Sequence, residues 1–317
     1  MARYLAITGG VGGAKLGLGL AKILGPDEVI FAVNTGDDFE HLGLYIAPDV
    51  DTLTYTLAEV SNTETGWGRG DETWHFMEAL ENLGGETWFR LGDRDLAVHI
   101  TRSQMLAAGH SLSEATAHIC GSLGVTHRVL PMSDDPVRTT VHTAAGPLAF
   151  QHYFVRDRCQ PSVTGFEFAG IGTATLNPQI RQCLTGPDKV DGIIICPSNP
   201  YVSVDPLLEI PGTRAAIKDS GIPVVAVSPI VAGTAIKGPT AKMMAELEIP
   251  ASAAEVAAHY GELLTALVLD QQDENLHNTL KTPTFVTNTV MVTLQDRVDL
   301  GHAVLGYFAA YFQGRQG

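Results

Sequence analysis

A run of glycines followed by a lysine is the first stretch of the sequence with clear chemical capacity. Four of the five residues at 9–13 are glycine, and Lys15 follows two positions later. Glycine lets the backbone turn sharply and bring its N–H groups close to an anion at the start of a helix, where Lys15 could reach a phosphate. The spacing matches neither GxGxxG nor GxxxxGK[ST], so neither named nucleotide motif applies. The loop predicts a phosphate site, and a tight turn without a ligand is the alternative.

Carboxylates follow the next apolar run. Residues 29–33 read VIFAV, and NTGDD occupies 34–38. A second acidic pair, Asp49 and Asp51, stands at the start of a predicted helix, where each is either a helix cap or faces the same pocket as the NTGDD aspartates. Aspartates beside phosphate-binding glycines are typical of Mg²⁺ that bridges carboxylate and phosphate oxygens. The pattern therefore indicates a Mg²⁺-dependent phosphoryl or nucleotidyl transfer.

Apolar segments throughout the chain end in small polar residues. This is hard to explain by core packing, whereas the strand ends of a parallel sheet share a crevice at one edge. We expect Lys15, Arg90 and Arg94 to supply positive charge to that crevice, although 90–95 could also be a solvated network of charge pairs. The six segment ends are at Gly9, Asn34, Gly92, Ser133, Ser198 and Ser228.

Two tryptophans among glycines form an unusual stretch at 66–74. Trp67 and Trp74 could give a flat platform for a planar ring or could anchor a loop on the core. Other catalytic chemistries find less support, because the histidines lack HxxxH or HxH spacing and no GxSxG elbow occurs. A nicotinamide-dependent oxidoreductase and a non-catalytic nucleotide-binding regulator stay open as alternatives. Against the first, Asn34 stands where an acidic residue usually ends the second strand.

The elements that must position these residues alternate between apolar strands and helices. With 317 residues, 45% hydrophobic and 17% charged, the chain can bury a large core as one domain over 1–317. We expect an α/β fold: a Rossmann-like three-layer parallel sheet flanked by helices, with a helical lid-like insertion and a small antiparallel β excursion at 137–171. The predicted strands are 4–7, 29–33, 88–91, 128–131, 139–142, 148–155, 192–195, 223–227 and 266–269. The predicted helices are 16–24, 52–60, 72–83, 96–108, 113–123, 177–184, 211–219, 252–265 and 294–312.

Charge and cysteine usage exclude several partners. A formal net charge of −15 argues against binding to nucleic acid or to an anionic membrane. The four cysteines are scattered without CxxC spacing, which disfavours a zinc site or a disulfide framework. No apolar run approaches eighteen residues, so we expect a cytoplasmic protein without a membrane span.

Seven short motifs, in order along nearly the whole chain, resemble the 2-phospho-L-lactate transferase family of the CofD type, which builds the deazaflavin coenzyme F-420. The resemblance implies a Mg²⁺-dependent transferase and probable homodimers. The motifs are GGVGGAK at 9–15, NTGDD at 34–38, PDVDT at 48–52, LGDRDLA at 91–97, LPMSDDP at 130–136, PSNP at 197–200 and VSPI at 227–230.

The reaction that this resemblance implies transfers a phospho-acid unit from its GDP-activated form to the deazaflavin precursor Fo. A primary hydroxyl of the ribityl tail of Fo would attack the β-phosphorus, and GMP would leave. The acid could be 2-phospholactate, phosphoenolpyruvate or 3-phosphoglycerate. The form of the glycine loop and the Arg or Lys before LGDRD bear on that choice.

Site residues follow from the same resemblance and from the pattern of strand ends. Asp51 and Lys15 are the predicted catalytic residues. Mg²⁺ is assigned to Asp51, with Asp37 and Asp38. The predicted Fo-binding residues are Asp51, Arg90, Gly92, Asp93 and Trp67. The predicted nucleotide-binding residues are Gly10, Val11, Gly12, Gly13, Lys15, Asn34, Thr35, Ser133, Ser198, Asn199 and Ser228.

Overall fold

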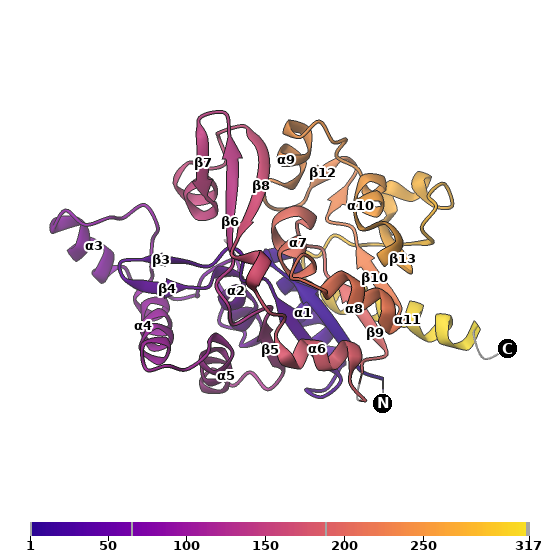
Figure 1. Cartoon of the computed structure of the whole chain (residues 1–317), viewed down its shortest axis with the longest axis horizontal. Helices are drawn as coiled ribbons and strands as arrows, with labels where there is room; N and C mark the ends of the chain where they lie inside the picture. The colour runs from indigo at the N-terminus through magenta and orange to yellow at the C-terminus, as the bar shows by residue number, and fades with distance from the viewer. Residues whose placement is uncertain (1, 65, 188, 315–317) are drawn as a thin grey trace.

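Seven parallel strands form the centre of the molecule (Figure 1). The computed structural model describes residues 2–64, 66–187 and 189–314. The strand order is β14-β13-β10-β9-β1-β2-β5, so the first strand lies inside the sheet with partners on both sides. The strands are β1 (Tyr4–Thr8), β2 (Val29–Val33), β5 (Arg128–Pro131), β9 (Gly192–Ile195), β10 (Val224–Val227), β13 (Ala266–Asp270) and β14 (Thr284–Thr287).

Helices cover both faces of this sheet, because its strands are apolar on both sides. Within β1, Tyr4 and Ala6 pack into one core, whereas Leu5 and Ile7 pack into the other. The first core takes residues from α1 (Gly10–Ile23), α2 (Pro48–Leu57), α5 (Leu112–Ser122) and α11 (Leu294–Gly314). The second takes residues from α6 (Pro178–Thr185), α7 (Asp205–Leu208), α8 (Thr213–Ser220), α9 (Thr240–Glu246) and α10 (Ala253–Tyr260). The predicted α/β three-layer class is confirmed.

Among the described residues, three small antiparallel sheets accompany the central one. The predicted β excursion is a three-stranded sheet in the order β7 (Gly146–Ala149), β6 (Arg138–Thr143) and β8 (Val163–Ala169). The predicted strand at 148–155 is wrong beyond Ala149, where the chain enters the π-helix η1 (His152–Arg156). Phe150 and Phe154 stack with ring centroids 5.5 Å apart, a helical spacing that overrides the alternation. The other two sheets are the pairs β3 (Phe39–His41) with β4 (Leu44–Ile46) and β11 (Ile230–Val231) with β12 (Thr234–Ala235).

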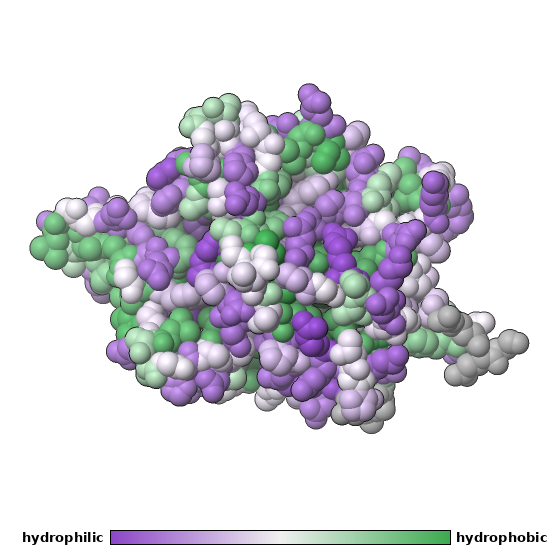
Figure 2. All heavy atoms as spheres, viewed as in Figure 1, coloured by the Kyte–Doolittle hydropathy of each residue, from purple (hydrophilic) through white to green (hydrophobic). Residues whose placement is uncertain are grey.

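A helical insertion between β4 and β5 projects from one side of the molecule (Figure 1). It holds α3 (His75–Asn82), α4 (Asp93–Ala107) and α5, which begins with a capping box at Ser111. The predicted strand at 88–91 is wrong, because the aromatic residues there pack on the β3–β4 hairpin instead, as Phe89 does edge-on against Phe39 at 4.9 Å. Hydrophobic residues gather on the surface at the tip of this insertion (Figure 2).

Short helical turns complete the chain between the larger elements. The 3-10 turns are η2 (Ile171–Thr173), η4 (Gly261–Leu263) and η5 (Gln271–Leu276), and η3 (Pro200–Val204) is a π-turn. Most predicted helices appear with shifted ends; the helix predicted at 252–265 stops at Tyr260, because Gly261 adopts a positive φ of 56°. Among the described residues, no helix is both long and apolar enough to span a membrane.

Candidate functional site

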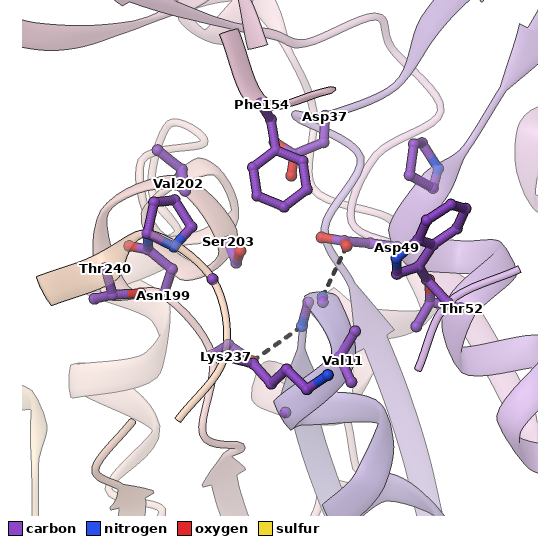
Figure 3. Close-up of a pocket in the computed structure, with 18 of the residues that line it drawn as sticks. Val11, Asp37, Asp49, Thr52, Phe154, Asn199, Val202, Ser203, Lys237 and Thr240 are labelled. Carbon is purple, nitrogen blue, oxygen red and sulfur yellow. Dashed lines mark hydrogen bonds between the residues drawn. The ribbon is translucent and has the colours of Figure 1, made fainter. Parts of the chain in front are cut away.

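A cavity of about 540 Å³ lies at the carboxyl edge of β1, β9 and β10 (Figure 3). Its wall combines the glycine loop, the loop after β2, the start of α2, the loop after β9 and the segments on either side of the β11–β12 hairpin. The π-helix η1 of the small sheet also contributes, through Phe154. This is the position at which open parallel sheets bind ligands.

The glycine loop is tied to two neighbouring loops through its backbone. The N–H of Gly9 donates to the Ser198 hydroxyl at 3.1 Å, and the N–H of Gly10 donates to Oδ1 of Asp49 at 2.7 Å. A Cβ atom on Gly12 would lie 2.3 Å from the Pro197 carbonyl oxygen. Glycine is therefore required for α1 to start this close to the loop after β9.

Asp49 is the hub of the acidic side of the cavity. It does not cap α2, whose N-cap is Ala47, but lies in the first turn and accepts a second hydrogen bond from Nδ2 of Asn34 at 2.9 Å. Burial raises the pKa of Asp49 to about 6, although the hydrogen bonds from Asn34 and Gly10 act in the opposite direction. Neither aspartate of the pair is a cap, so that alternative is wrong for both Asp49 and Asp51.

Asp37 lines the same cavity and completes a pair of buried carboxylates. Burial raises its pKa well above the usual range, and the charges of Asp49 and Asp38 raise it further. Its Oδ1 has no hydrogen-bond partner among the described residues. Oxygen ligands of this kind suit Mg²⁺, whose charge would relieve the repulsion between the two carboxylates. The donor set therefore fits the metal, although no three His, Cys, Asp or Glu side chains converge within 2–64, 66–187 and 189–314.

Asp38 and Asp51 point to other partners. Asp38 accepts from the Tyr45 hydroxyl at 2.8 Å and lies outside the cavity lining. Burial raises the pKa of Asp38 to about 8, against the lowering effect of nearby Arg138. Asp51 lines the cavity, but Arg102 holds both of its carboxylate oxygens.

Positive charge reaches the cavity from several elements. Lys15, in the first two turns of α1, donates to the Met291 carbonyl at 2.8 Å. Burial lowers the pKa of Lys15, and the charges of Arg297 and Lys237 lower it further. Three cationic side chains close together in a protein of net charge −15 favour an anionic ligand in the part of the cavity near Lys15.

Aromatic side chains line another part of the wall. Trp67, Tyr55 and Phe89 line the cavity, and Arg90 does so with its guanidinium 4.2 Å above the Trp74 ring. Trp74 itself lies outside the lining, so of the two predicted tryptophans it is Trp67 that lines the cavity. Its side chain is 55% exposed.

Known proteins resemble this chain over most of its length. The family described as 2-phospho-L-lactate transferase CofD matches residues 5–304. The chain belongs to the CofD family. It is 40% identical over 280 residues to the phosphoenolpyruvate transferase of Kitasatospora aureofaciens, with 86% of each chain covered. It is 34% identical over 307 residues to the 2-phospho-L-lactate transferase of Methanosarcina acetivorans, covering 96% of this chain and 98% of that protein.

The fold has a solved relative as well. A crystal structure of a UPF0052-family protein from Bacillus halodurans superposes with a TM-score of 0.65 at 17% identity, covering 96% of this chain and 100% of that one. At this identity the likeness concerns the fold alone. The predicted CofD family, and with it the predicted transferase class, is confirmed by the sequence relatives.

The residues predicted for the CofD-type site divide into two groups. Those that line the cavity are Gly10, Val11, Gly12, Lys15, Asp37, Asp51, Trp67, Arg90, Ser198, Asn199 and Ser228. Those outside the lining are Gly13, Asn34, Thr35, Asp38, Gly92, Asp93 and Ser133. Asn34 still acts on the site through Asp49, whereas Asp93 caps the α3 segment by accepting from the N–H groups of His75 and Phe76.

Sequence reasoning missed part of the CofD-family cavity wall. His99 lines the cavity four residues after Asp95 of the charged stretch 90–95, a spacing that places both side chains on one helical face. Phe154 and Lys237 gave no signal, because they come from η1 and from the segment after β12, whose approach to the glycine loop depends on how the β6–β8 and β11–β12 sheets pack.

Proposed function

We propose that this CofD-family protein transfers a phospho-acid moiety from its GDP-activated form to a ribityl hydroxyl of Fo, with release of GMP, in coenzyme F-420 biosynthesis. The observation that carries the proposal is a single cavity in which the glycine loop, the Asp37–Asp49 pair and the aromatic wall meet. These three parts match a diphosphate, a divalent cation and a planar ring. The homodimer implied by the family resemblance and the cytoplasmic location expected from the sequence belong to the same proposal.

The donor would lie along the glycine loop. Backbone N–H groups near Gly12 and the ammonium of Lys15 would face the diphosphate, with Ser198 and Asn199 beside them from the loop after β9. Because these groups are fixed by the α1 start, they can stabilise the charge that develops in the transition state without rearranging.

The metal would be Mg²⁺, held by Asp37 and Asp49. When bound, it would neutralise the charge on the diphosphate oxygens. This assignment replaces Asp38 and Asp51 of the sequence prediction by Asp49, since Asp38 is turned toward Tyr45 and Asp51 is held by Arg102. Asn34 would keep the Asp49 carboxylate in place.

The acceptor would occupy the aromatic side of the cavity. Trp67 would cover the deazaflavin ring, and Asp51 with Arg90 would contact the polar tail. The hydroxyl oxygen would form a bond to the β-phosphorus, the bond from that phosphorus to the bridging oxygen would break, and GMP would leave. The hydroxyl proton would leave through the carboxylates or water of the cavity.

Activity assays with each of the three activated acids test this proposal. The relatives named above act, by their names, on phosphoenolpyruvate and 2-phospho-L-lactate, so both are primary donors, with 3-phosphoglycerate as the third. We expect Mg²⁺-dependent GMP release that requires Fo. If Fo changes nothing and no donor yields GMP, the transferase proposal fails, whether the protein proves to be a nucleotide-binding regulator or an oxidoreductase.

A further inference from the structure

A buried polar network between α2 and α4 forms part of one wall of the cavity. On α4, Asp95, His99 and Arg102 are spaced so that they share one helical face. They meet Asp51 and Tyr55, which are four residues apart on α2.

Arg102 holds Asp51 with both ends of its guanidinium. Nη1 donates to Oδ2 at 3.1 Å, and Nη2 donates to Oδ1. Arg102 is fully buried and lies behind the wall, whereas Asp51 lines the cavity. Although burial acts to lower the pKa of Arg102, the charge and hydrogen bonds of Asp51 raise it above its usual value. A permanent cation with a planar fork therefore fixes the plane of the carboxylate.

His99 closes the network from the other side. Its Nδ1 lies 3.3 Å from Nη1 of Arg102 and 3.6 Å from Oδ2 of Asp51, and its Nε2 lies 3.2 Å from Oδ2 of Asp95. The Tyr55 hydroxyl donates to the second oxygen of Asp95. His99 thus limits how far the Arg102 guanidinium can rotate.

The position of the network is more informative about its function than its contribution to stability is. A buried ion pair contributes little net stability compared with packed apolar side chains of similar volume. Here the pair is placed so that only the carboxylate reaches the cavity, on the wall that also carries Trp67 and Phe89. Each carboxylate oxygen has two lone-pair sites, so Asp51 can accept from a ligand while Arg102 holds it.

We propose that Arg102 is a positioning residue for the acceptor: it fixes the orientation in which Asp51 accepts a hydrogen bond from a hydroxyl group of the bound molecule. This inference rests on the proposed function, in which that molecule is Fo with its polyhydroxylated tail. His99 supports Arg102, and neither residue contacts the donor.

A double-mutant cycle on Asp51 and Arg102 tests the inference. Binding of Fo and of GDP is measured separately by calorimetric titration of the full chain. We expect Arg102→Gln to weaken Fo binding by about tenfold, the loss typical of one misaligned charged hydrogen bond, while GDP binding changes by less than about twofold. The double variant Asp51→Asn/Arg102→Gln should bind Fo no more weakly than Asp51→Asn, because Arg102 then has no carboxylate to orient.

A second variant covers the risk that Arg102→Gln does not fold. Arg102→Lys keeps the buried positive charge but loses the two-pronged contact, and it should weaken Fo binding in the same selective way. Arg181→Lys, at an exposed position of α6, is the matched control and should change neither affinity.

Three results would overturn the inference. These are unchanged Fo affinity in a folded Arg102 variant, equal losses for Fo and GDP, and additive losses for Fo in the double variant. A wild-type protein that binds no Fo would overturn it as well. Failure of the proposed function is a separate outcome, because it is seen as absent GMP release by the wild-type protein, whatever the affinities of the variants.

Discussion

The backbone N–H of Gly10 donates to Oδ1 of Asp49 at 2.7 Å, which joins the glycine loop after β1 to the first turn of α2. Asn34 donates to the other carboxylate oxygen, so the loops after β1 and β2 meet at one side chain. Beside this hub, Asp37 adds a second buried carboxylate. The arrangement brings two buried carboxylates close together, so the free energy of unfolding of the metal-free protein should depend on pH.

The metal-free protein should lose stability as the pH rises. A carboxyl group whose pKa is higher in the folded state binds its proton more tightly there, so its contribution is complete below the unfolded pKa and is lost as the pH approaches the folded value. For Asp49 that window runs from the usual 3.8 to about 6. The shift corresponds to about 3 kcal/mol, and thermal melts in a chelator across this range measure it.

Replacing Asp37 by asparagine should separate stability from metal binding. Because the raised pKa of Asp37 costs stability at pH 8, Asp37→Asn should raise the free energy of unfolding and the Tm in a chelator. Mg²⁺ should raise the Tm of the wild-type protein and leave that of Asp37→Asn unchanged. The matched control is Asp38→Asn, which removes another buried carboxylate that lies outside the cavity and should keep the Mg²⁺ response. Equal Mg²⁺ responses in wild type and Asp37→Asn would remove Asp37 from the metal site.

Alanine at Gly12 should damage both fold and activity. Its Cβ would overlap the carbonyl oxygen of Pro197, a backbone atom that cannot rotate away, so α1 must shift from the loop after β9. We expect a loss of about 1–3 kcal/mol in unfolding free energy and a large fall in kcat/KM. Gly121→Ala on α5 is the control, because no atom lies within 4 Å of the added Cβ, and helix propensity should make it neutral or stabilising. A Gly12→Ala protein with wild-type stability and turnover would contradict the close approach.

The fold could be predicted from the sequence where an apolar run was followed by the small polar residues typical of a loop. The runs at 4–7 and 29–33 became β1 and β2 because both faces of these strands are buried. Residues 88–91 show the limit of the method. They have the composition of a strand, but Phe89 finds partners on the β3–β4 hairpin and the backbone never joins the sheet. Gly92 therefore precedes α4 and does not end a strand.

The site could be predicted only in part, for a related reason. Gly12 and Asp37 each lie four residues after the end of a strand, β1 and β2, so the topology of a parallel sheet brings them to one edge. Arg102 is the tenth residue of α4, a helix that follows no strand directly, and its contact with Asp51 depends on how α4 packs near α2. A contact between two helices that depends on how an insertion packs leaves no local pattern in the sequence.

Lys15 should matter for turnover more than for stability. Its ammonium lies in a partly buried position beside other cations, where water screens its charge less than at the surface. An anionic ligand would therefore be attracted to it more strongly than to an exposed lysine. Lys15→Met should lower kcat by about a hundredfold, the cost of losing one electrostatic contact to a transition state, with little change in Tm. Lys22→Met on the same helix removes only an exposed pair with Glu59 and should leave kcat unchanged. Steady-state GMP release measures both, and equal rates for the two variants would exclude a role for Lys15 in the transfer.

Trp67 should affect binding of the acceptor without affecting the chemical step. The ring lines the aromatic side of the cavity and would contact the planar part of Fo, which does not change during the reaction. Such a contact stabilises ground and transition states equally, so its loss raises KM and leaves kcat unchanged. We expect Trp67→Ala to raise the KM for Fo by about tenfold, equivalent to about 1.4 kcal/mol, and Trp67→Phe to recover most of the loss. Leu83→Ala is the control, because Leu83 is 86% exposed and lies outside the cavity lining. A fall in kcat at unchanged KM, or a rise in the KM for the donor instead of Fo, would contradict the contact between Trp67 and the planar part of Fo.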